Sequence, residues 1–290
     1  MLKFRILSVL GLLLPLSFGI RAEERGCDVA AAMQEVSRPV IGRYGMAIGG
    51  SSIVSTYLSP VEYTGMRLSL GGEWDKVAPF AGGRLKMHFE GNVGGAWSLL
   101  NPAATASMQE IDVDFSWTLE RLWRFPHNFT FSAGGGIMAE GGAAALLKNS
   151  NNPVAVNIAA AVNARCEGTW QTHISRLPML MRVGMRMPLV GAFFMPEYGE
   201  TFYEIYLGNR RGLVHALYPG NYPEINLKAA VALDFGRTAM EVGYMLQWRR
   251  TSANHLIERV ADNMFFINII PGGMGLKSKK KCCGKVCYPY

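Results

Sequence analysis

The sequence predicts an all-β protein: an antiparallel transmembrane β-barrel of about ten strands, preceded by a cleaved signal peptide. Three observations support this fold class. Many segments alternate between apolar and polar side chains with a period of two, as strands do. No apolar segment of helix-spanning length follows the N-terminus. The connections between the alternating segments tend to be short and long in turn, which is typical of outer-membrane barrels.

The N-terminus has the pattern of a secretory signal peptide over residues 1–22. Lys3 and Arg5 precede an apolar run over residues 6–16, and smaller, more polar residues lead to Ala22. A single membrane anchor is the alternative, although the apolar run is shorter than the roughly 20 residues that span a bilayer. Residues 23–38 are expected to form a periplasmic segment ahead of the barrel.

Residues 84–97 show the alternation in its simplest form. An extended chain points successive side chains to opposite faces, so this segment presents an apolar face to lipid and a charged face to the lumen. The two faces carry Leu85, Met87, Phe89, Val93 and Trp97, and Lys86, His88, Glu90 and Asn92.

Ten segments of this kind fill residues 39–273, the predicted barrel. An even number returns both ends of the barrel to the periplasm. Aromatic residues near the segment ends (Trp74, Trp97, Phe125, Trp170, Phe193 and Trp248) are expected to form interfacial girdles. A soluble β-sandwich is the alternative. The segments are residues 39–50, 64–75, 84–97, 110–120, 129–140, 154–171, 179–193, 225–235, 240–249 and 263–271, and the longer connections are residues 51–63, 101–107, 149–153 and 196–224.

Two stretches resemble known outer-membrane proteins. Met264-Phe265-Phe266-Ile267-Asn268-Ile269 is similar to the aromatic-rich last strand that Gram-negative barrels offer to the barrel-assembly machinery. Thr56-Tyr57-Leu58-Ser59-Pro60-Val61-Glu62-Tyr63-Thr64-Gly65 resembles a sequence of an uncharacterised family of small single-chain outer-membrane barrels. The resemblance implies a Gram-negative outer-membrane location. In such barrels the last strand usually ends the chain, whereas here about twenty residues follow it.

The formal net charge of +7 does not indicate nucleic-acid binding. Part of it lies in the signal peptide and part in residues 274–290, a basic, cysteine-rich tail expected in the periplasm, and no basic helix or aromatic RNA-binding motif accompanies it. Disulfides among Cys282, Cys283 and Cys287, or from these to Cys27, are open alternatives in an oxidising envelope. The spacing predicts neither a metal site nor a cofactor site.

Charged residues of both signs are predicted to face the lumen. A barrel of about eight strands is filled by its own side chains, and so a barrel of about ten should be mostly plugged by paired charges. A selective pore is the alternative. The predicted inward charges are Arg67, Glu73, Lys86, His88, Glu90, Asp112, Asp114, Glu120, Glu140, Arg165, Glu167, Arg182, Arg186, Lys228, Asp234, Glu241 and Arg249.

Two further groups are candidate functional sites. Asp112 and Asp114 share a face near the predicted external rim, where a histidine from a loop, His215 or His255, could complete an acid/base site resembling that of ten-stranded outer-membrane proteases. The connection over residues 196–224 is rich in tyrosine and arginine, which are frequent at recognition hot spots; it could contact a partner or cover the barrel mouth. Its candidate residues are Tyr198, Tyr203, Tyr206, Arg210, Arg211, Tyr218 and Tyr222.

The sequence thus favours a non-enzymatic outer-membrane barrel, either a narrow, porin-like pore or a structural and interaction component. An outer-membrane enzyme of protease or lipid-modifying type is the alternative. The expected partners are outer-membrane lipid, the assembly machinery, and an envelope protein or a small polar ligand, but not nucleic acid.

Overall fold

The computed structural model describes residues 38–149, 152–208, 212–276 and 288–290. The predicted signal peptide, most of residues 23–38, and the cysteines at 27, 282, 283 and 287 lie outside these ranges, as do Arg210 and Arg211. The strands are β1 (Ile41–Ser55), β2 (Ser59–Val77), β3 (Leu85–Leu100), β4 (Ser107–Phe125), β5 (Phe129–Ala145), β6 (Val154–Ile174), β7 (Leu177–Phe194), β8 (Val214–Leu217), β9 (Glu224–Asp234), β10 (Thr238–Ala253) and β11 (Leu256–Pro271), with a 3₁₀ turn η1 (Ala81–Gly83) and a helix α1 (Phe202–Tyr206).

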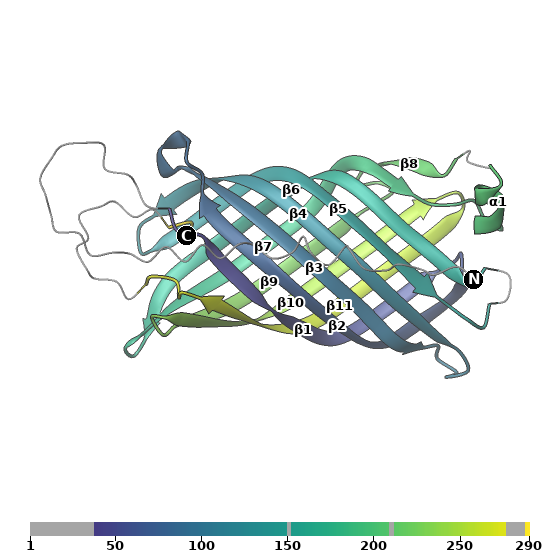
Figure 1. Ribbon diagram of the computed structural model, residues 1–290, viewed down its shortest axis with the longest axis horizontal. Helices are drawn as coiled ribbons and strands as arrows, with labels where there is room; N and C mark the ends of the chain where they lie inside the picture. The colour runs from purple at the N-terminus through teal and green to yellow at the C-terminus, as the bar shows by residue number, and fades with distance from the viewer. Residues whose placement is uncertain (1–37, 150–151, 209–211, 277–287) are drawn as a thin grey trace, which may run out of the picture. The chain divides into compact units, whose positions relative to one another are not determined.

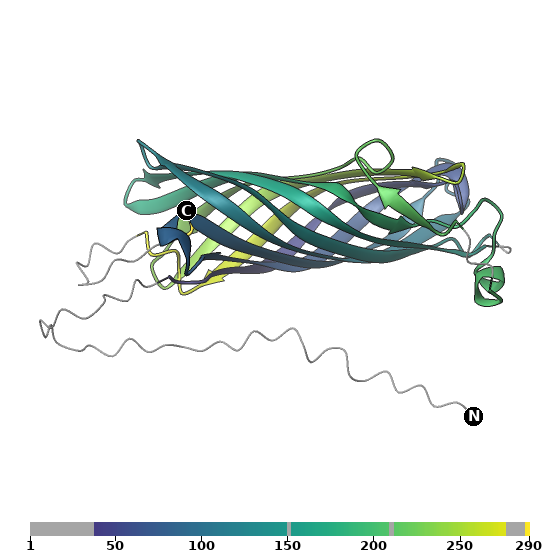
Figure 2. The same cartoon turned by 90° about the horizontal axis from the view of Figure 1, so that it is seen from above.

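Ten antiparallel strands close the barrel wall, which confirms the predicted fold class. Neighbours in sequence are neighbours in the sheet from β1 to β6, β11 returns to pair with β1, and β6 pairs with β7 to complete the ring. The short strand β8 only extends the sheet beside the end of β7. The strands run obliquely around the barrel, as Figures 1 and 2 show. No helix among the described residues is long and apolar enough to cross a membrane.

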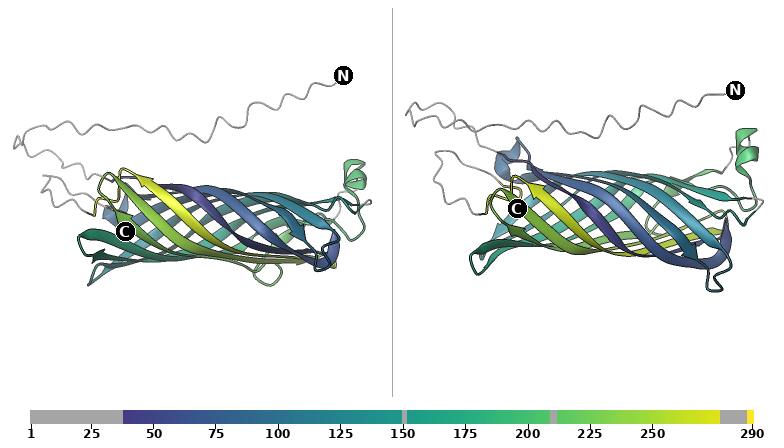
Figure 3. Two further views of the ribbon diagram at one scale, coloured as in Figure 1. Left: turned by 90° about the horizontal axis from the view of Figure 1, so that it is seen from below. Right: turned by 60° about the horizontal axis from the view of Figure 1, so that its bottom comes forward.

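The barrel has two distinct ends. The terminal end holds the start of β1, the end of β11, η1 and the described C-terminal residues 288–290, whereas the loop end holds α1 and β8 (Figures 1 and 3). The connections at the terminal end include Pro126–Asn128 and Ser175–Arg176, and the loop end carries the longest connection, residues 195–223.

The outward face carries an apolar band that suits lipid. Met66, Ile111, Val183 and Phe265 expose between 58% and 70% of their surface and lie on four different strands. Aromatic side chains lie on the outside toward the terminal end: Trp74 donates to the hydroxyl of Tyr44 at 2.8 Å. Aromatic rings with polar edges suit the boundary between hydrocarbon and water. The outer surface therefore has the polarity expected of a transmembrane barrel.

The prediction of a loop over residues 51–63 is wrong. β1 runs to Ser55 and β2 starts at Ser59, so a tight turn joins them. The apolar alternation is lost here because the outward positions are polar, and the hydroxyl of Ser52 donates to the carboxylate of Glu62. A strand such as β2, with 19 residues, is longer than the roughly 9–11 residues that cross a bilayer. Its polar end is therefore still strand, and the first connection at the loop end is short.

The prediction that Phe193 belongs to an outer girdle is also wrong, because its ring is buried inside the lumen. β7 pairs Asn163 with Pro188 and Val162 with Val190, so Leu189 is an extra residue. A β-bulge of this kind reverses the inward and outward positions that follow it. On its other edge, β7 pairs with β9 up to Arg186 and with β8 only from Gly191. Residues 187–190 thus form a seam without ladder partners on that side.

Candidate functional site

The lumen is the candidate site, because the inward positions of the strands place most of the charged side chains there. Ser116, Thr118, Glu120 and His88 are all fully buried inside the barrel. Buried charges are costly unless they are paired and hydrogen-bonded. The charged residues accordingly sort into a central layer of interlocked ion pairs and an acidic layer nearer the loop end.

Arg182 joins opposite sides of the central layer. One guanidinium nitrogen lies 2.5 Å from Glu73 on β2 and 3.2 Å from Glu167 on β6, and the other lies 2.9 Å from Glu241 on β10. Arg182 itself comes from β7. Its fork of donors can bond several carboxylates at once, which an ammonium group does less rigidly. A single side chain therefore ties four strands together across the lumen.

A second group of interlocked ion pairs lies beside Arg182. Arg165 contacts Glu120 at 2.5 Å and Glu167 at 2.6 Å, and the ammonium of Lys86 lies 3.1 Å and 2.8 Å from the same two carboxylates. Glu120 thus has two cationic partners, and Glu167 has three, because Arg182 also contacts it. Alternation along the strands makes this geometry possible, because it sends residues such as Lys86 and Arg165 to the same side of the wall.

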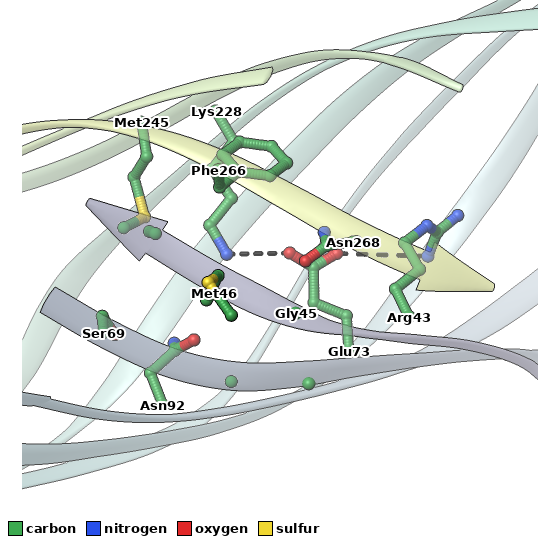
Figure 4. A pocket seen from close by; sticks show the side chains of 13 residues that line it. Arg43, Gly45, Met46, Ser69, Glu73, Asn92, Lys228, Met245, Phe266 and Asn268 are labelled. Carbon is green, nitrogen blue, oxygen red and sulfur yellow. Dashed lines mark hydrogen bonds and ion pairs between the residues drawn. The ribbon is translucent and has the colours of Figure 1, made fainter. Parts of the chain in front are cut away.

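His88 and Lys228 complete the central layer. The imidazole Nδ1 of His88 lies 2.8 Å from Asp75, and its Nε2 lies 3.7 Å from Glu90. Lys228 donates to Glu73 at 2.8 Å and also contacts Glu90. Arg43 pairs with Asp75. A cavity of about 30 Å³ lies against this part of the layer, and Figure 4 shows Glu73 between Lys228 and Arg43.

Positive and negative groups are matched in number in the central layer of the described chain. The carboxylates are Glu73, Asp75, Glu90, Glu120, Glu167 and Glu241, and the basic groups are Arg43, Lys86, His88, Arg165, Arg182 and Lys228. The numbers are equal when His88 is protonated, because a neutral imidazole leaves one carboxylate in excess. Nearly all the side chains of this layer are buried, and ion pairs link them to one another.

The acidic layer is not balanced. Its guanidinium groups belong to Arg67, Arg186 and Arg249, and more carboxylates than these surround them. Arg67 contacts Asp112 most closely and lies 2.8 Å from Glu110, Arg186 lies 2.7 Å from Asp114, and Arg249 lies 2.9 Å from Glu140. The carboxylates of the layer are Glu110, Asp112, Asp114, Glu140, Glu224, Glu258 and Asp262.

Asp112 and Asp114, the predicted acidic pair, are each held by an arginine. Arg67 contacts Asp112, and Arg186 donates to Asp114. His215 lies on β8, where its ring is next to Phe193 and 3.3 Å from the carbonyl of Met195, and His255 is exposed in the turn between β10 and β11. Among the described contacts none joins either histidine to either aspartate. The structure does not assemble the predicted acid/base site.

Apolar clusters lie toward both ends of the barrel, beyond the charged layers. Phe193, Leu217 and Tyr222 belong to one cluster at the loop end, and Ile53 and Leu99 belong to another. At the terminal end, Tyr290 packs with Ile41, Leu180, Ala232, Ala239, Ile270 and Met274. Burial raises the pKa of the Tyr290 phenol well above its usual range. These clusters add apolar packing at both ends of the described barrel.

The long connection at the loop end presents exposed tyrosines. Tyr198, Tyr203 and Tyr206 expose 75%, 68% and 81% of their surface, and Tyr218 exposes 53%. Tyr222 is different: it is fully buried and its hydroxyl donates to Glu140. The prediction that Tyr222 serves as an external contact is therefore wrong. Tyr222 follows β8, and so the chain has already returned to the lumen before β9 begins.

The exposed segment is anchored by its own hydrogen bonds. Thr201 and Glu204 form a capping box at the start of α1, with Glu204 accepting from the Thr201 amide at 2.7 Å. These hydrogen bonds lower the pKa of the Glu204 carboxyl. The hydroxyl of Tyr57, from the turn between β1 and β2, donates to the carbonyl of Glu200 at 2.6 Å. Burial and the charge of Glu200 raise the pKa of Tyr57.

The chain matches a family model over residues 7–280, and the family is described as "Protein of unknown function (DUF3316)". The chain belongs to this family. No curated protein matches it in sequence. The match of the DUF3316 model extends over all the barrel strands, which agrees with the predicted resemblance to an uncharacterised barrel family.

Solved outer-membrane barrels are similar to the DUF3316 chain in fold. The protease OmpT of Escherichia coli is 7% identical, with a TM-score of 0.48, covering 80% of this chain and 96% of its own. The β domain of the Bordetella autotransporter BrkA is 10% identical, with a TM-score of 0.40, and coverage is 81% and 100%. The transport unit of the autotransporter AIDA-I from Escherichia coli is 8% identical, with a TM-score of 0.37, and coverage is 84% and 92%.

Several lumen residues of this DUF3316 protein were missed by sequence reasoning. Glu224 falls in a segment predicted as loop, and Asp262 precedes the predicted start of the last strand, yet both are inward and almost fully buried. Arg43 and Asp75 lie on the predicted inner face, but the sequence offered no sign that they pair with each other. An inward charge at the end of a strand could have been found by extending each alternation past its last apolar residue.

Proposed function

We propose that the protein is a plugged outer-membrane barrel that acts as a structural and interaction component, with the tyrosine-rich connection as its external contact surface. The observation that carries this proposal is the bridging of the lumen by Arg182, which contacts carboxylates from β2, β6 and β10. A pore would need a path for water past this layer, and the layer is neutral and interlocked. We favour this role over an enzyme because arginines hold Asp112 and Asp114.

The exposed tyrosines support the contact surface. Tyr203 and Tyr206 lie on α1 and Tyr198 precedes it, and the capping box together with the Tyr57 hydrogen bond holds the segment in place. Large aromatic side chains that are already ordered lose little conformational freedom on binding. Export by the signal peptide, insertion by the assembly machinery and residence in the outer membrane of a Gram-negative cell complete the proposal, and an envelope protein is the proposed partner.

Conductance of the refolded protein in a planar lipid bilayer tests the plugged barrel. We expect no steady openings from the native sequence, because paired charges and apolar clusters fill the lumen. Heat-modifiable migration on a gel establishes that the sample is a folded barrel before it is tested. Steady, ion-selective openings from folded protein would contradict the proposal and favour a pore.

Site-specific photo-crosslinking in intact cells tests the contact surface. A photoreactive residue in place of Tyr206 should form a defined adduct, and the same residue in place of Leu147, which is 77% exposed in another connection at the loop end, serves as the matched control. The adduct at position 206 should disappear when Tyr198 and Tyr203 are replaced by serine. Equal adducts at both positions would show only general proximity and would contradict a specific surface.

A further inference from the structure

Two arginines lie side by side on the outside of the wall. Arg250 on β10 is directly opposite Arg259 on β11 in the register of the sheet. Residues that are directly opposite in an antiparallel pair point to the same face. Both side chains are exposed. Their sequence neighbours Arg249 and Val260 are buried on the lumen side, and so the two arginines point away from the lumen.

This arginine pair lies at one edge of the lipid-facing band. The outward positions of β10 that precede Arg250 are Met240, Val242, Tyr244, Leu246 and Trp248. They extend over residues 240–248, about the 9–11 residues with which a tilted strand crosses a bilayer. Trp248 ends this run, and an aromatic ring with a polar edge suits the boundary of the membrane. The arginine pair therefore lies where the hydrocarbon gives way to lipid headgroups at the loop end.

Neither arginine forms an ion pair with a carboxylate among the described residues. Glu258 precedes Arg259, but it points inward and pairs with Arg249 at 3.1 Å. Glu62, on the outer surface of β2, accepts a hydrogen bond from Ser52 instead. Like charges placed directly opposite each other destabilise a sheet. An anion from outside the chain that contacts both guanidinium groups would remove this repulsion.

We propose that the arginine pair binds the phosphate group of a membrane lipid in the leaflet at the loop end. A guanidinium group is planar and donates two parallel hydrogen bonds to phosphate oxygens. The Cβ atoms of directly opposite residues are about 4.5–5.5 Å apart, so that two guanidinium groups can reach one phosphate together. The acyl chains of the same lipid would lie along the apolar positions that begin at Trp248. This site is separate from the tyrosine-rich surface, and so either proposal can fail while the other holds.

Native mass spectrometry of the refolded, full-length protein in detergent tests the site with dipalmitoyl phosphatidic acid. Dipalmitoylglycerol has the same acyl chains without the phosphate and is the matched control lipid. We expect phosphatidic acid to bind at least about tenfold more tightly, because hydrogen bonds between charged groups are absent from the control. Inorganic phosphate at the same concentration should not displace the lipid. Equal binding of the two lipids, or displacement by inorganic phosphate, would overturn the proposal.

Variants locate the binding. Arg259→Gln removes one guanidinium group and should weaken phosphatidic acid binding about tenfold. Because the change also removes a repulsion, the barrel should still fold, which heat-modifiable migration checks. If it does not fold, Arg250→Gln replaces it with the same expected loss. Arg121→Gln is the matched control, because Arg121 is also exposed on an outward position but lies opposite Leu85 and Ala133.

Binding should be unchanged in the control variant. An equal loss in Arg259→Gln and Arg121→Gln would show diffuse attraction to positive surface charge and would overturn the proposed site. Unchanged affinity in folded Arg259→Gln would overturn it as well.

Discussion

Replacing Arg182 by glutamine should destabilise the barrel by the cost of one buried carboxylate that loses its closest cation, although the guanidinium contacts three carboxylates. Glu73 keeps Lys228 at 2.8 Å, and Glu167 keeps Lys86 at 2.8 Å and Arg165 at 2.6 Å. Glu241 loses its closest cation and keeps the amide of Asn268 at 2.9 Å and the guanidinium of Arg43 at 3.5 Å. Removing one partner of a buried ion pair costs about 3–5 kcal/mol, and so we expect a loss of that size in the free energy of unfolding.

Urea-induced unfolding in lipid vesicles, followed by tryptophan fluorescence, measures this loss as a shift of the transition midpoint. Arg237→Gln, at an exposed arginine in the turn between β9 and β10, is the control and should change stability by less than about 0.5 kcal/mol. The double variant Arg182→Gln with Glu241→Gln also removes the carboxylate charge that lost its closest cation, and it should be more stable than Arg182→Gln alone. A loss below about 1 kcal/mol in the single variant, or a double variant that is weaker still, would refute the reasoning.

Further predictions concern both ends of the barrel. Tyr57→Phe removes the hydrogen bond to the carbonyl of Glu200 and should lower the local stability of the connection by about 0.5–1.5 kcal/mol. The loss should appear as faster hydrogen exchange in residues 196–208, and unchanged exchange would contradict the anchoring role. Tyr290→Phe removes a buried hydroxyl that has no hydrogen-bond partner among the described residues, and unfolding by urea should show equal or greater stability. Because burial raises the pKa of Tyr290 above that of the unfolded chain, stability should be full below about pH 10 and fall as the pH rises further. In Tyr290→Phe the free energy of unfolding should decrease less steeply above that pH. An unchanged pH profile would exclude this phenol as the source of the decrease.

Alternation along the strands was enough to predict the barrel and the inward direction of residues such as Lys86, Glu167 and Arg182, because the two faces of each strand meet lipid and lumen. It failed where both faces are polar, as at Ser52 and Glu62, since a strand that leaves the membrane no longer needs an apolar side. It also failed at Leu189, because a bulge adds one residue without any change in composition.

The candidate sites were harder to predict than the fold. Which lumen charges touch depends on pairings across the barrel, such as Arg182 with Glu73, whose positions in the chain are far apart. No local pattern in the sequence indicates such a contact. The partition into a neutral central layer and an acidic layer depends on the stagger of all the strands together, and so a list of inward charges could not distinguish the layers.

The seam over residues 187–190 gives the wall a mechanically weak line. Elsewhere each wall strand pairs with a neighbouring strand along most of both edges. Here the neighbour of β7 changes from β9 to β8, and residues 187–190 between the two pairings have no partner on that edge. Pro188 has no amide hydrogen to offer, and so the gap cannot be repaired by a small shift of the strands. Under lateral tension from the lipid, we therefore expect the wall to yield first at this seam, where one proline and one extra leucine leave β7 without ladder partners on one edge.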